Sequence, residues 1–244
     1  MALTVNADDF GFSESVNTAI AEAFAKKLID RTTLMANMPC ARKAMELARK
    51  EGFSDKVGIH VNLTSGHPLV EELSKDAVMC DPAGEFSADF ARNMKTRFHL
   101  PKETSSLVEK EIRAQFDMYR ELGGTLWHVD SHHYVHTDPS IWKILKKVIK
   151  DYPVTSVRLT RNMFTGGSRL MHIYKSMLNR SIRRFCAGDP VYFGSAEDYA
   201  SYFADPAAAS AKYDIEVMVH PVYDESGTLC DIYHEKYHKL TQLH

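Results

Sequence analysis

Short apolar segments alternate with amphipathic helical segments along this chain, and this alternation constrains its fold more than any other feature. The first apolar segment ends at Asn6, and a helical pattern follows Ser13, a residue type well suited to cap a helix. Further strands are expected at 32–38, 57–63, 125–129, 156–160 and 215–219. Because these segments are apolar on both faces, as parallel strands are, we predict an α/β fold, either a barrel or a doubly wound sheet.

Helix boundaries between these strands support the same pattern. A helix is expected at 41–50, and a second one ends at Gly123. Asp138 and Pro139 predict the start of another helix, with Asp138 as the N-cap and the proline at the first helical position. Neither a repeat nor a linker interrupts the chain. We therefore predict one domain over residues 1–244, a length that a single α/β barrel often has.

The charge balance favours a small molecule as the partner. Thirty basic and thirty-two acidic side chains give a formal net charge of −2, which supplies no field for nucleic acid or for an anionic membrane. A homodimer is compatible with this surface. We find neither a signal-like start nor a run of about 18 apolar residues, so a cytoplasmic location is expected. The cysteines form no CxxC pair and suit reduced thiols; they are Cys40, Cys80, Cys186 and Cys230.

Two adjacent carboxylates follow the first strand, in the segment 6–11. Asp8 and Asp9 lie where the loops of a parallel barrel carry functional groups. Neighbouring side chains on an extended backbone point in different directions, so one aspartate can bind a cation while the other acts on water or substrate. Capping of the next helix is the simpler alternative, but Ser13 is better placed for it.

Four histidines lie between residues 128 and 136, and this cluster is the strongest chemical signal in the chain. Neutral imidazole is a common ligand for zinc and similar metals, and Asp130 is suited to orient one from behind. The absent cysteine pairs exclude a zinc finger, and the absent glutamate excludes a helical HExxH site. The pattern therefore favours a catalytic site with two histidines and one carboxylate from three strands.

Two further histidines lie in other predicted strands. His60 is in the segment 57–63, where a hydrogen-bonded core histidine is the commoner explanation for a single residue. His220 ends the strand 215–219 before Pro221, where a catalytic acid and a structural role are equally compatible with the pattern. A functional role for either histidine is favoured only because the other polar clusters also lie at the ends of predicted strands.

The motifs resemble those of the YdjC-like carbohydrate deacetylases. Residues 6–11 are similar to the family's NADDFG, 58–64 to GxHxNLT, 128–136 to HxDSHHxxH, and 216–221 to its late MxHP element. The resemblance implies a distorted TIM-like (β/α) barrel related to polysaccharide deacetylases. Members of the family continue beyond the late histidine with a further helix and strand, whereas this chain ends at residue 244. We therefore expect a barrel that is incomplete at its C-terminal end.

The resemblance also implies a site. It makes Asp9, His60 and His132 the ligands of one divalent metal ion, with Asp8 as the general base. The donor set suits zinc but also tolerates magnesium. The resemblance further implies that His220 is the general acid and that Arg158 holds Asp8 or the substrate. It also implies that Tyr192 and Phe193 form an aromatic element near the sugar.

The resulting prediction is a metal-dependent hydrolase that removes the acetyl group from an N-acetylated sugar such as a chitooligosaccharide. Two alternatives stay open. A metal-dependent phosphoesterase would use the same ligands with Arg158 and Arg161, and would usually need a second cation. A sugar-binding relative without catalysis would have no use for Asp8. The basic residues between 158 and 184 are expected mostly on a solvated face, and the segment 64–102 is a candidate lid.

Overall fold

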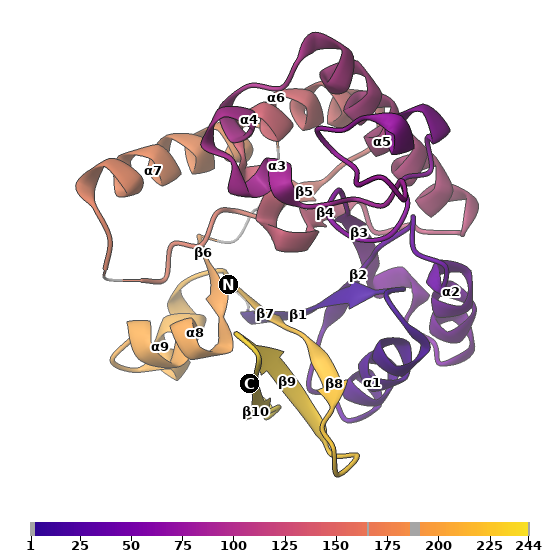
Figure 1. The fold of residues 1–244 in the computed structure, drawn as a ribbon. Coiled ribbons are helices and arrows are strands. Elements are labelled where there is room, and N and C mark those ends of the chain that lie inside the picture. The colour runs from indigo at the N-terminus through magenta and orange to yellow at the C-terminus, as the bar shows by residue number, and fades with distance from the viewer. Residues whose placement is uncertain (1–2, 165, 186–190, 244) are drawn as a thin grey trace.

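Seven parallel strands form the central sheet of the computed structural model, which describes residues 3–164, 166–185 and 191–243 (Figure 1). Their order is β5-β4-β3-β2-β1-β7-β6, so the first strand of the chain lies near the middle. The edge strands β5 and β6 do not pair with each other in the described ranges, and the curled sheet is an open half-barrel. The predicted barrel-type fold is confirmed, and the opening of the half-barrel lies between β5 and β6. The strands are β1 (Leu3–Phe10), β2 (Arg31–Leu34), β3 (Val57–Val61), β4 (His128–Ser131), β5 (Ser156–Val157), β6 (Tyr192–Ser195) and β7 (Ile215–Val219).

Helices connect successive strands, as parallel pairing requires. α1 leads from β1 to β2, α2 to β3, α5 to β4, α6 to β5 and α7 to β6, while α8 and α9 both precede β7. Figure 1 shows α1 and α2 on one side of the sheet, with α8 and α9 beside β6 at its other end. The helices are α1 (Glu14–Ala25), α2 (Ala41–Lys50), α3 (Asp89–Arg92), α4 (Met94–Phe98), α5 (Lys102–Glu121), α6 (Pro139–Val148), α7 (Arg169–Arg183), α8 (Ala196–Tyr202) and α9 (Pro206–Lys212), with 3₁₀ turns η1 (Ser54–Lys56), η2 (Glu71–Lys75), η3 (His132–Thr137) and η4 (Ile149–Asp151).

β1 is longer than the sequence predicts and carries both aspartates. It continues past Asn6 because Phe10 is buried and pairs with Leu34 of β2. The register of this pairing shifts between Ala7 and Phe10, and Asp9 has a left-handed φ of 69°. Asp8 and Asp9 therefore lie at an irregular strand end, where the kink separates the directions of their side chains.

The predicted helix starts are confirmed, with one exception in detail. The Ser13 side chain accepts a hydrogen bond from the Val16 N–H and caps α1. α6 starts at Pro139, but the Asp138 side chain makes no capping hydrogen bond. Asp138 is the N-cap residue and Pro139 the first helical residue, as predicted, but the Asp138 Oδ1 accepts a 2.7 Å hydrogen bond from Arg97 Nε instead of one from the helix backbone.

α7 is a long helix in a stretch for which the sequence predicts no regular element. Only Leu178, Asn179 and Ile182 of this helix are buried, so its pattern contains too few core positions to predict a helix. The basic residues of this region divide by exposure. Those on the solvated face are Arg169, Arg180, Arg183 and Arg184, whereas Arg161 and Lys175 are half-buried and Arg158 is fully buried.

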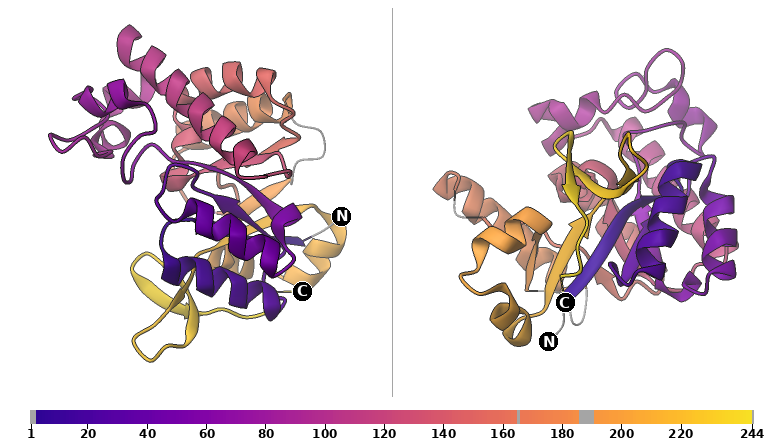
Figure 2. Two further views of the ribbon diagram at one scale, coloured as in Figure 1. Left: turned by 90° about the vertical axis from the view of Figure 1, so that its right-hand side faces the viewer. Right: turned by 90° about the horizontal axis from the view of Figure 1, so that it is seen from below.

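The segment after β7 forms a second, three-stranded antiparallel sheet that the sequence analysis did not predict. This C-terminal ribbon consists of β8 (Pro221–Tyr223), β9 (Leu229–Tyr233) and β10 (Lys236–Lys239), in the order β10-β9-β8. It packs against α1, and Figures 1 and 2 show it beside that helix. The Tyr223 hydroxyl donates a 2.7 Å hydrogen bond to Glu22 of α1, which joins the ribbon to the barrel.

The remaining expectations concern thiols and membranes. Cys40, Cys80 and Cys230 are free thiols, as predicted, and Cys186 lies outside the described residues. Within the described ranges, we find no helix with the length and apolar character needed to cross a bilayer. The segment 64–102 folds into η2, α3 and α4, and its role as a lid remains a prediction.

Gly58 of β3 sits where the strands approach each other too closely for a side chain. A Cβ there would lie 2.8 Å from the backbone oxygen of His128 in β4 and 3.1 Å from Thr33 in β2. We predict that Gly58→Ala lowers the free energy of unfolding by about 1–3 kcal/mol, because the backbone oxygen cannot move away cheaply. Denaturant unfolding measures this, with Gly166→Ala as the control because no atom lies within 4 Å of its Cβ position. Equal effects of the two substitutions would contradict the prediction.

Candidate active site

The carboxyl ends of β1, β3 and β4 meet at one cavity of about 480 Å³. In parallel barrels this end of the sheet carries the functional groups, because the loops that follow the strands converge there. The predicted residues that line it are Asp8, Asp9, His60, His132 and His220. The C-terminal ribbon supplies another wall, so the cavity has one side from the barrel and one from the antiparallel sheet.

Asp9, His60 and His132 form the candidate metal cluster. Asp9 Oδ1 lies 3.1 Å from His60 Nε2 and 2.7 Å from His132 Nδ1, and one donor atom from each residue lies within 4.8 Å of the other two. His60 Nε2 is buried and makes no well-aligned hydrogen bond in the described part of the chain. Two imidazoles, one carboxylate and an unsatisfied ring nitrogen fit a divalent ion.

The other nitrogen of His60 explains how this ring is held. His60 Nδ1 lies 2.7 Å from Asp130 Oδ1, and the Thr33 hydroxyl donates to Asp130 Oδ2 at 3.0 Å. A carboxylate behind an imidazole sets its tautomer and its orientation, the role that the sequence predicts for Asp130. Burial opposes protonation of His60, but Asp130 and Asp9 prevail and raise its pKa to about 10. Burial likewise opposes ionisation of Asp9, yet His132 and His60 lower the pKa of Asp9 well below its ordinary value.

Arg158 is the centre of a buried charge network behind the cavity. Its side chain is fully buried and donates two hydrogen bonds to the Asp8 carboxylate, at 2.6 and 2.7 Å. The guanidinium also contacts Asp130 Oδ2 at 2.8 Å and Glu216 Oε1 at 2.7 Å. Burial would lower the pKa of Arg158, but these three carboxylates raise it well above the ordinary value. The predicted contact between Arg158 and Asp8 is present, and it fixes the orientation of the carboxylate.

The same network explains why only one of the acidic clusters suits a cation. Among the residues that the structure describes, two further groups have donor atoms close enough together; they are Asp8, His60 and Asp130, and His128, Asp130 and Glu216. Both contain carboxylates that already bind Arg158. Because the guanidinium supplies the positive charge there, the Asp9 cluster is the group best suited to a metal ion.

His220 lies at the cavity beside Asp8, as a catalytic acid would. Its Nε2 lies 4.0 Å from Asp8 Oδ2, and its Nδ1 lies 3.9 Å from Asp231 Oδ1. Asp231 is buried and accepts a 2.6 Å hydrogen bond from the His220 backbone N–H. The ribbon thus supplies the carboxylate that holds this strand end.

The other histidines of the 128–136 cluster have different partners. His136 is buried, with one ring nitrogen at the Ser131 hydroxyl and the other 3.1 Å from the Arg158 backbone oxygen. His133 has a left-handed φ of 52°, and its Nδ1 lies 3.0 Å from the Thr64 hydroxyl. Burial lowers the pKa of His133 and of His136 to about 4, so both rings are neutral. Two of the four histidines therefore serve the loop that presents His132.

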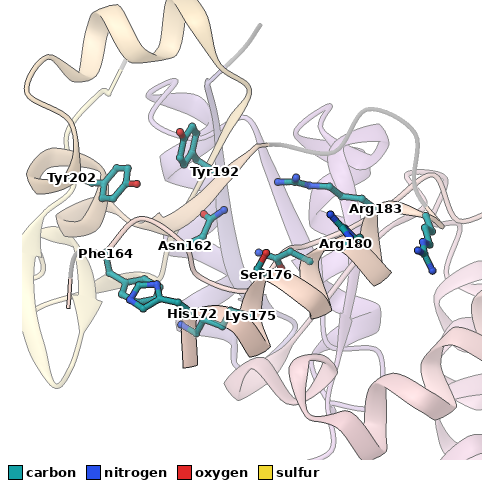
Figure 3. Close-up of a pocket in the computed structure, with 11 residues that line it drawn as sticks. Asn162, Phe164, His172, Lys175, Ser176, Arg180, Arg183, Tyr192 and Tyr202 are labelled. Carbon is teal, nitrogen blue, oxygen red and sulfur yellow. The ribbon is translucent and has the colours of Figure 1, made fainter. Parts of the chain in front are cut away.

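Tyr192 and Phe193 do not reach this cavity. Phe193 is fully buried, with its ring 4.8 Å from the Arg158 guanidinium, and therefore supports the charge network. Tyr192 lines a second cavity of about 540 Å³ between α7 and β6 (Figure 3). The second cavity is basic and contains no other predicted site residue; its side chains include Lys175, Arg180, Arg183 and Arg184.

Several residues that support the site are assigned no role from the sequence. Asn6 donates to Asp8 Oδ1 at 2.8 Å, and Thr33 supports Asp130. Arg31 pairs with the buried Glu216 at 2.9 Å. Asn6 opens the motif at 6–11, and a buried polar residue inside a predicted strand is the available clue for Thr33, whereas the cavity residues of β9 and of the turn after it lie outside every motif.

The fold and the site together define a class: an open α/β barrel with a carboxylate and imidazole cluster at the carboxyl ends of its strands. The chain belongs to the YdjC-like family, because the family model described as "YdjC-like protein" matches residues 2–242. A protein of Brevibacillus brevis named carbohydrate deacetylase is 32% identical over 94% of this chain and 84% of its own length. One of Halalkalibacterium halodurans with the same name is 29% identical over 91% of this chain and 86% of its own length.

A solved structure confirms the fold independently. A protein from Enterococcus faecalis V583, described as a candidate cellobiose-phosphate cleavage protein, superposes with a TM-score of 0.68. The alignment covers 92% of this chain and 82% of that chain, at 22% sequence identity. At this identity the likeness supports the shared architecture and carries no conclusion about the substrate.

The raised pKa of His60 predicts a pH dependence of stability. A group with a folded pKa above its unfolded value, here about 10 against an ordinary 6.5, stabilises the fold fully below pH 6.5 and loses this contribution as the pH rises through 10. Between about pH 6 and pH 10, we expect the free energy of unfolding of the metal-free wild type to fall by roughly a few kcal/mol more than that of the metal-free His60→Gln variant. Urea unfolding in the presence of a chelator measures the difference, and a constant gap between the two proteins would refute it.

Proposed function

We propose that this protein is a metal-dependent carbohydrate deacetylase that hydrolyses the acetamido group of an N-acetylated sugar, such as a chitooligosaccharide. The observation that carries the proposal is the position of Asp8. This carboxylate is oriented by Arg158 and lies in the same cavity as the Asp9 cluster without belonging to it. A base beside a metal site is what amide hydrolysis requires. The relatives named carbohydrate deacetylase support the sugar as the substrate class.

Asp9, His60 and His132 would hold one divalent ion, with Asp130 orienting His60. When bound, the ion supplies Lewis-acid polarisation of the acetyl carbonyl. Zinc suits the two imidazoles, and magnesium or manganese would also accept the carboxylate and water. The substrate is the only partner that the proposal requires.

Asp8 takes a proton from the attacking water as the water oxygen bonds to the acetyl carbon. Arg158 holds both oxygens of this carboxylate, so the base is fixed in direction before the substrate arrives. His220 then gives a proton to the sugar nitrogen as the carbon–nitrogen bond breaks, which releases acetate and a free amine. Its Nε2 lies 4.0 Å from Asp8 Oδ2, so the proposed acid and the proposed base face the same part of the cavity.

Two other functions fit the site less well. A phosphoesterase would usually bind a second cation, but in the described ranges the other acidic groups are occupied by Arg158. A sugar-binding protein without catalysis would not need an oriented carboxylate beside the metal cluster.

Acetate release from N,N′-diacetylchitobiose, with metal-stripped and reconstituted protein, tests the proposal. We expect activity only in the reconstituted protein, and we expect Asp8→Asn to lower kcat by about 10²–10⁴-fold while metal content stays normal. The asparagine keeps the size of the side chain but removes its basicity. Near-normal turnover by Asp8→Asn would eliminate this residue as the base, and phosphate release without acetate release would favour the phosphoesterase.

The metal assignment makes a separate prediction. Replacement of Asp9, His60 or His132 by alanine should abolish stoichiometric metal, measured by elemental analysis of the folded proteins. His133→Ala is the matched control, because this neighbouring histidine bonds Thr64 and should retain one ion per chain. Loss of metal in His133→Ala together with retention in His132→Ala would show that the wrong imidazole has been assigned.

A further inference from the structure

The tip of the β9–β10 hairpin faces the catalytic cavity. Tyr233, His234 and Glu235 line the cavity together with Ile232, although none of them lies in a motif of the sequence. The hairpin belongs to the C-terminal ribbon, so these side chains come from a different sheet than the catalytic residues.

The turn is built from residues that such a turn does not favour. Tyr233 pairs with Lys236, which leaves His234 and Glu235 as a two-residue loop. Their φ angles are 49° and 60°, and two-residue hairpin loops with positive φ at both positions strongly prefer Asn-Gly or Gly-Gly. Large side chains at this turn cost conformational energy, and strain of this kind concentrates at functional sites.

The same kind of strain surrounds the whole cavity. The structure has seven non-glycine residues with positive φ in the described ranges, and five of these line the cavity. Two of the five belong to the turn, and the others are Asp9, His133 and Tyr134. Asp9 is a candidate metal ligand, and the His133 loop presents another. The hairpin tip therefore has the same unusual positive φ angles as the segments that hold the candidate ligands.

Tyr233 is held close to the reacting groups. Its ring lies 6.5 Å from the His220 ring with an interplanar angle of 17°, and the Arg161 guanidinium lies 5.5 Å from its centroid. His220 in turn lies beside Asp8. Tyr233 is therefore a neighbour of the residue proposed to protonate the leaving nitrogen. A pyranose ring has apolar C–H faces that pack on aromatic rings, and its hydroxyls need polar partners at the rim.

We propose that the hairpin tip binds the sugar ring that carries the acetamido group: Tyr233 packs against the face of the pyranose, and the exposed His234 and Glu235 bind its hydroxyls. The inference rests on the proposed function for the identity of the sugar. It makes the C-terminal ribbon the element that selects the substrate, while the barrel supplies the chemistry. The strained turn is retained because Asn-Gly would remove the two side chains that contact the sugar.

Binding of N,N′-diacetylchitobiose to the metal-loaded protein, measured by calorimetry, tests the role of Tyr233. We expect Tyr233→Ala to weaken binding about tenfold and to raise KM more than it lowers kcat, because it removes a contact shared by the ground state and the transition state. Tyr233→Phe should keep most of the affinity. Metal content and Tm should stay normal in both variants. Tyr237→Ala is the control, because this exposed tyrosine of the same ribbon does not line the cavity.

The turn itself allows a second and sharper test. The double variant His234→Asn/Glu235→Gly suits the hairpin better, so its Tm should rise while its affinity for the disaccharide falls. A structural role of the turn predicts instead that a higher Tm accompanies unchanged affinity, and that result would overturn the inference. Equal weakening of binding by Tyr237→Ala and Tyr233→Ala would overturn it as well.

The outcomes separate this inference from the proposed function. Acetate release by the wild type together with unchanged binding in the Tyr233 and turn variants would refute the hairpin inference alone. Disaccharide binding that depends on Tyr233, without acetate release, would refute the deacetylase and leave the hairpin as the sugar site. Absence of both binding and acetate release in the wild type would refute both.

Discussion

The buried guanidinium of Arg158 is the interaction on which the rest of the structure depends. It joins Asp8 of β1, Asp130 of β4 and Glu216 of β7, so one side chain links strands from across the half-barrel. Burying these charges costs solvation energy, which is offset only while every member of the network is paired. Loss of the arginine would leave three carboxylates together without their common counter-charge. The sheet is open and lacks the strand pairing that closes a complete barrel. The Arg158 network connects its strands through the interior instead.

The network that holds the strands together also arranges the chemistry. Arg158 orients Asp8 directly, and it orients His60 indirectly through Asp130. The positions of the proposed base and of one proposed metal ligand therefore both depend on Arg158, and a displacement of this arginine would move both side chains. Stability and the proposed catalysis are coupled because the same hydrogen bonds would serve both, and residues behind the cavity can matter as much as those that line it.

Substrate selection is proposed to reside elsewhere, in the C-terminal ribbon. The ribbon reaches the cavity because Asp231 of β9 binds the backbone of His220 and Tyr223 of β8 binds Glu22 of α1. These contacts anchor a small sheet that would have little core of its own. The division between a barrel that carries out the reaction and an attached element that recognises the sugar allows the two functions to vary separately.

Much of the fold and most of the residues proposed for catalysis could be predicted from the sequence. The apolar runs, the helix at 41–50 and the motif residues Asp8, Asp9 and His132 are local signals, because burial on both faces and capping chemistry act over a few residues. The parallel sheet follows from such signals and from the resemblance, whereas the opening between β5 and β6 is seen only in the structure. The ribbon was not predicted because its strands are short and β10 is mostly exposed, and α7 because few of its residues are buried.

The sequence by itself determined the order of the strands along the chain, the residue types of the site and their placement at strand ends. Only the tertiary structure decided that Arg158 is buried rather than solvated, that His136 bonds a backbone oxygen while His132 faces Asp9, and that Tyr233 enters the cavity. The physical reason is that each of these roles depends on partners far away in the chain. An arginine becomes an internal counter-ion only when folding brings three carboxylates to it, and no local pattern records that arrangement.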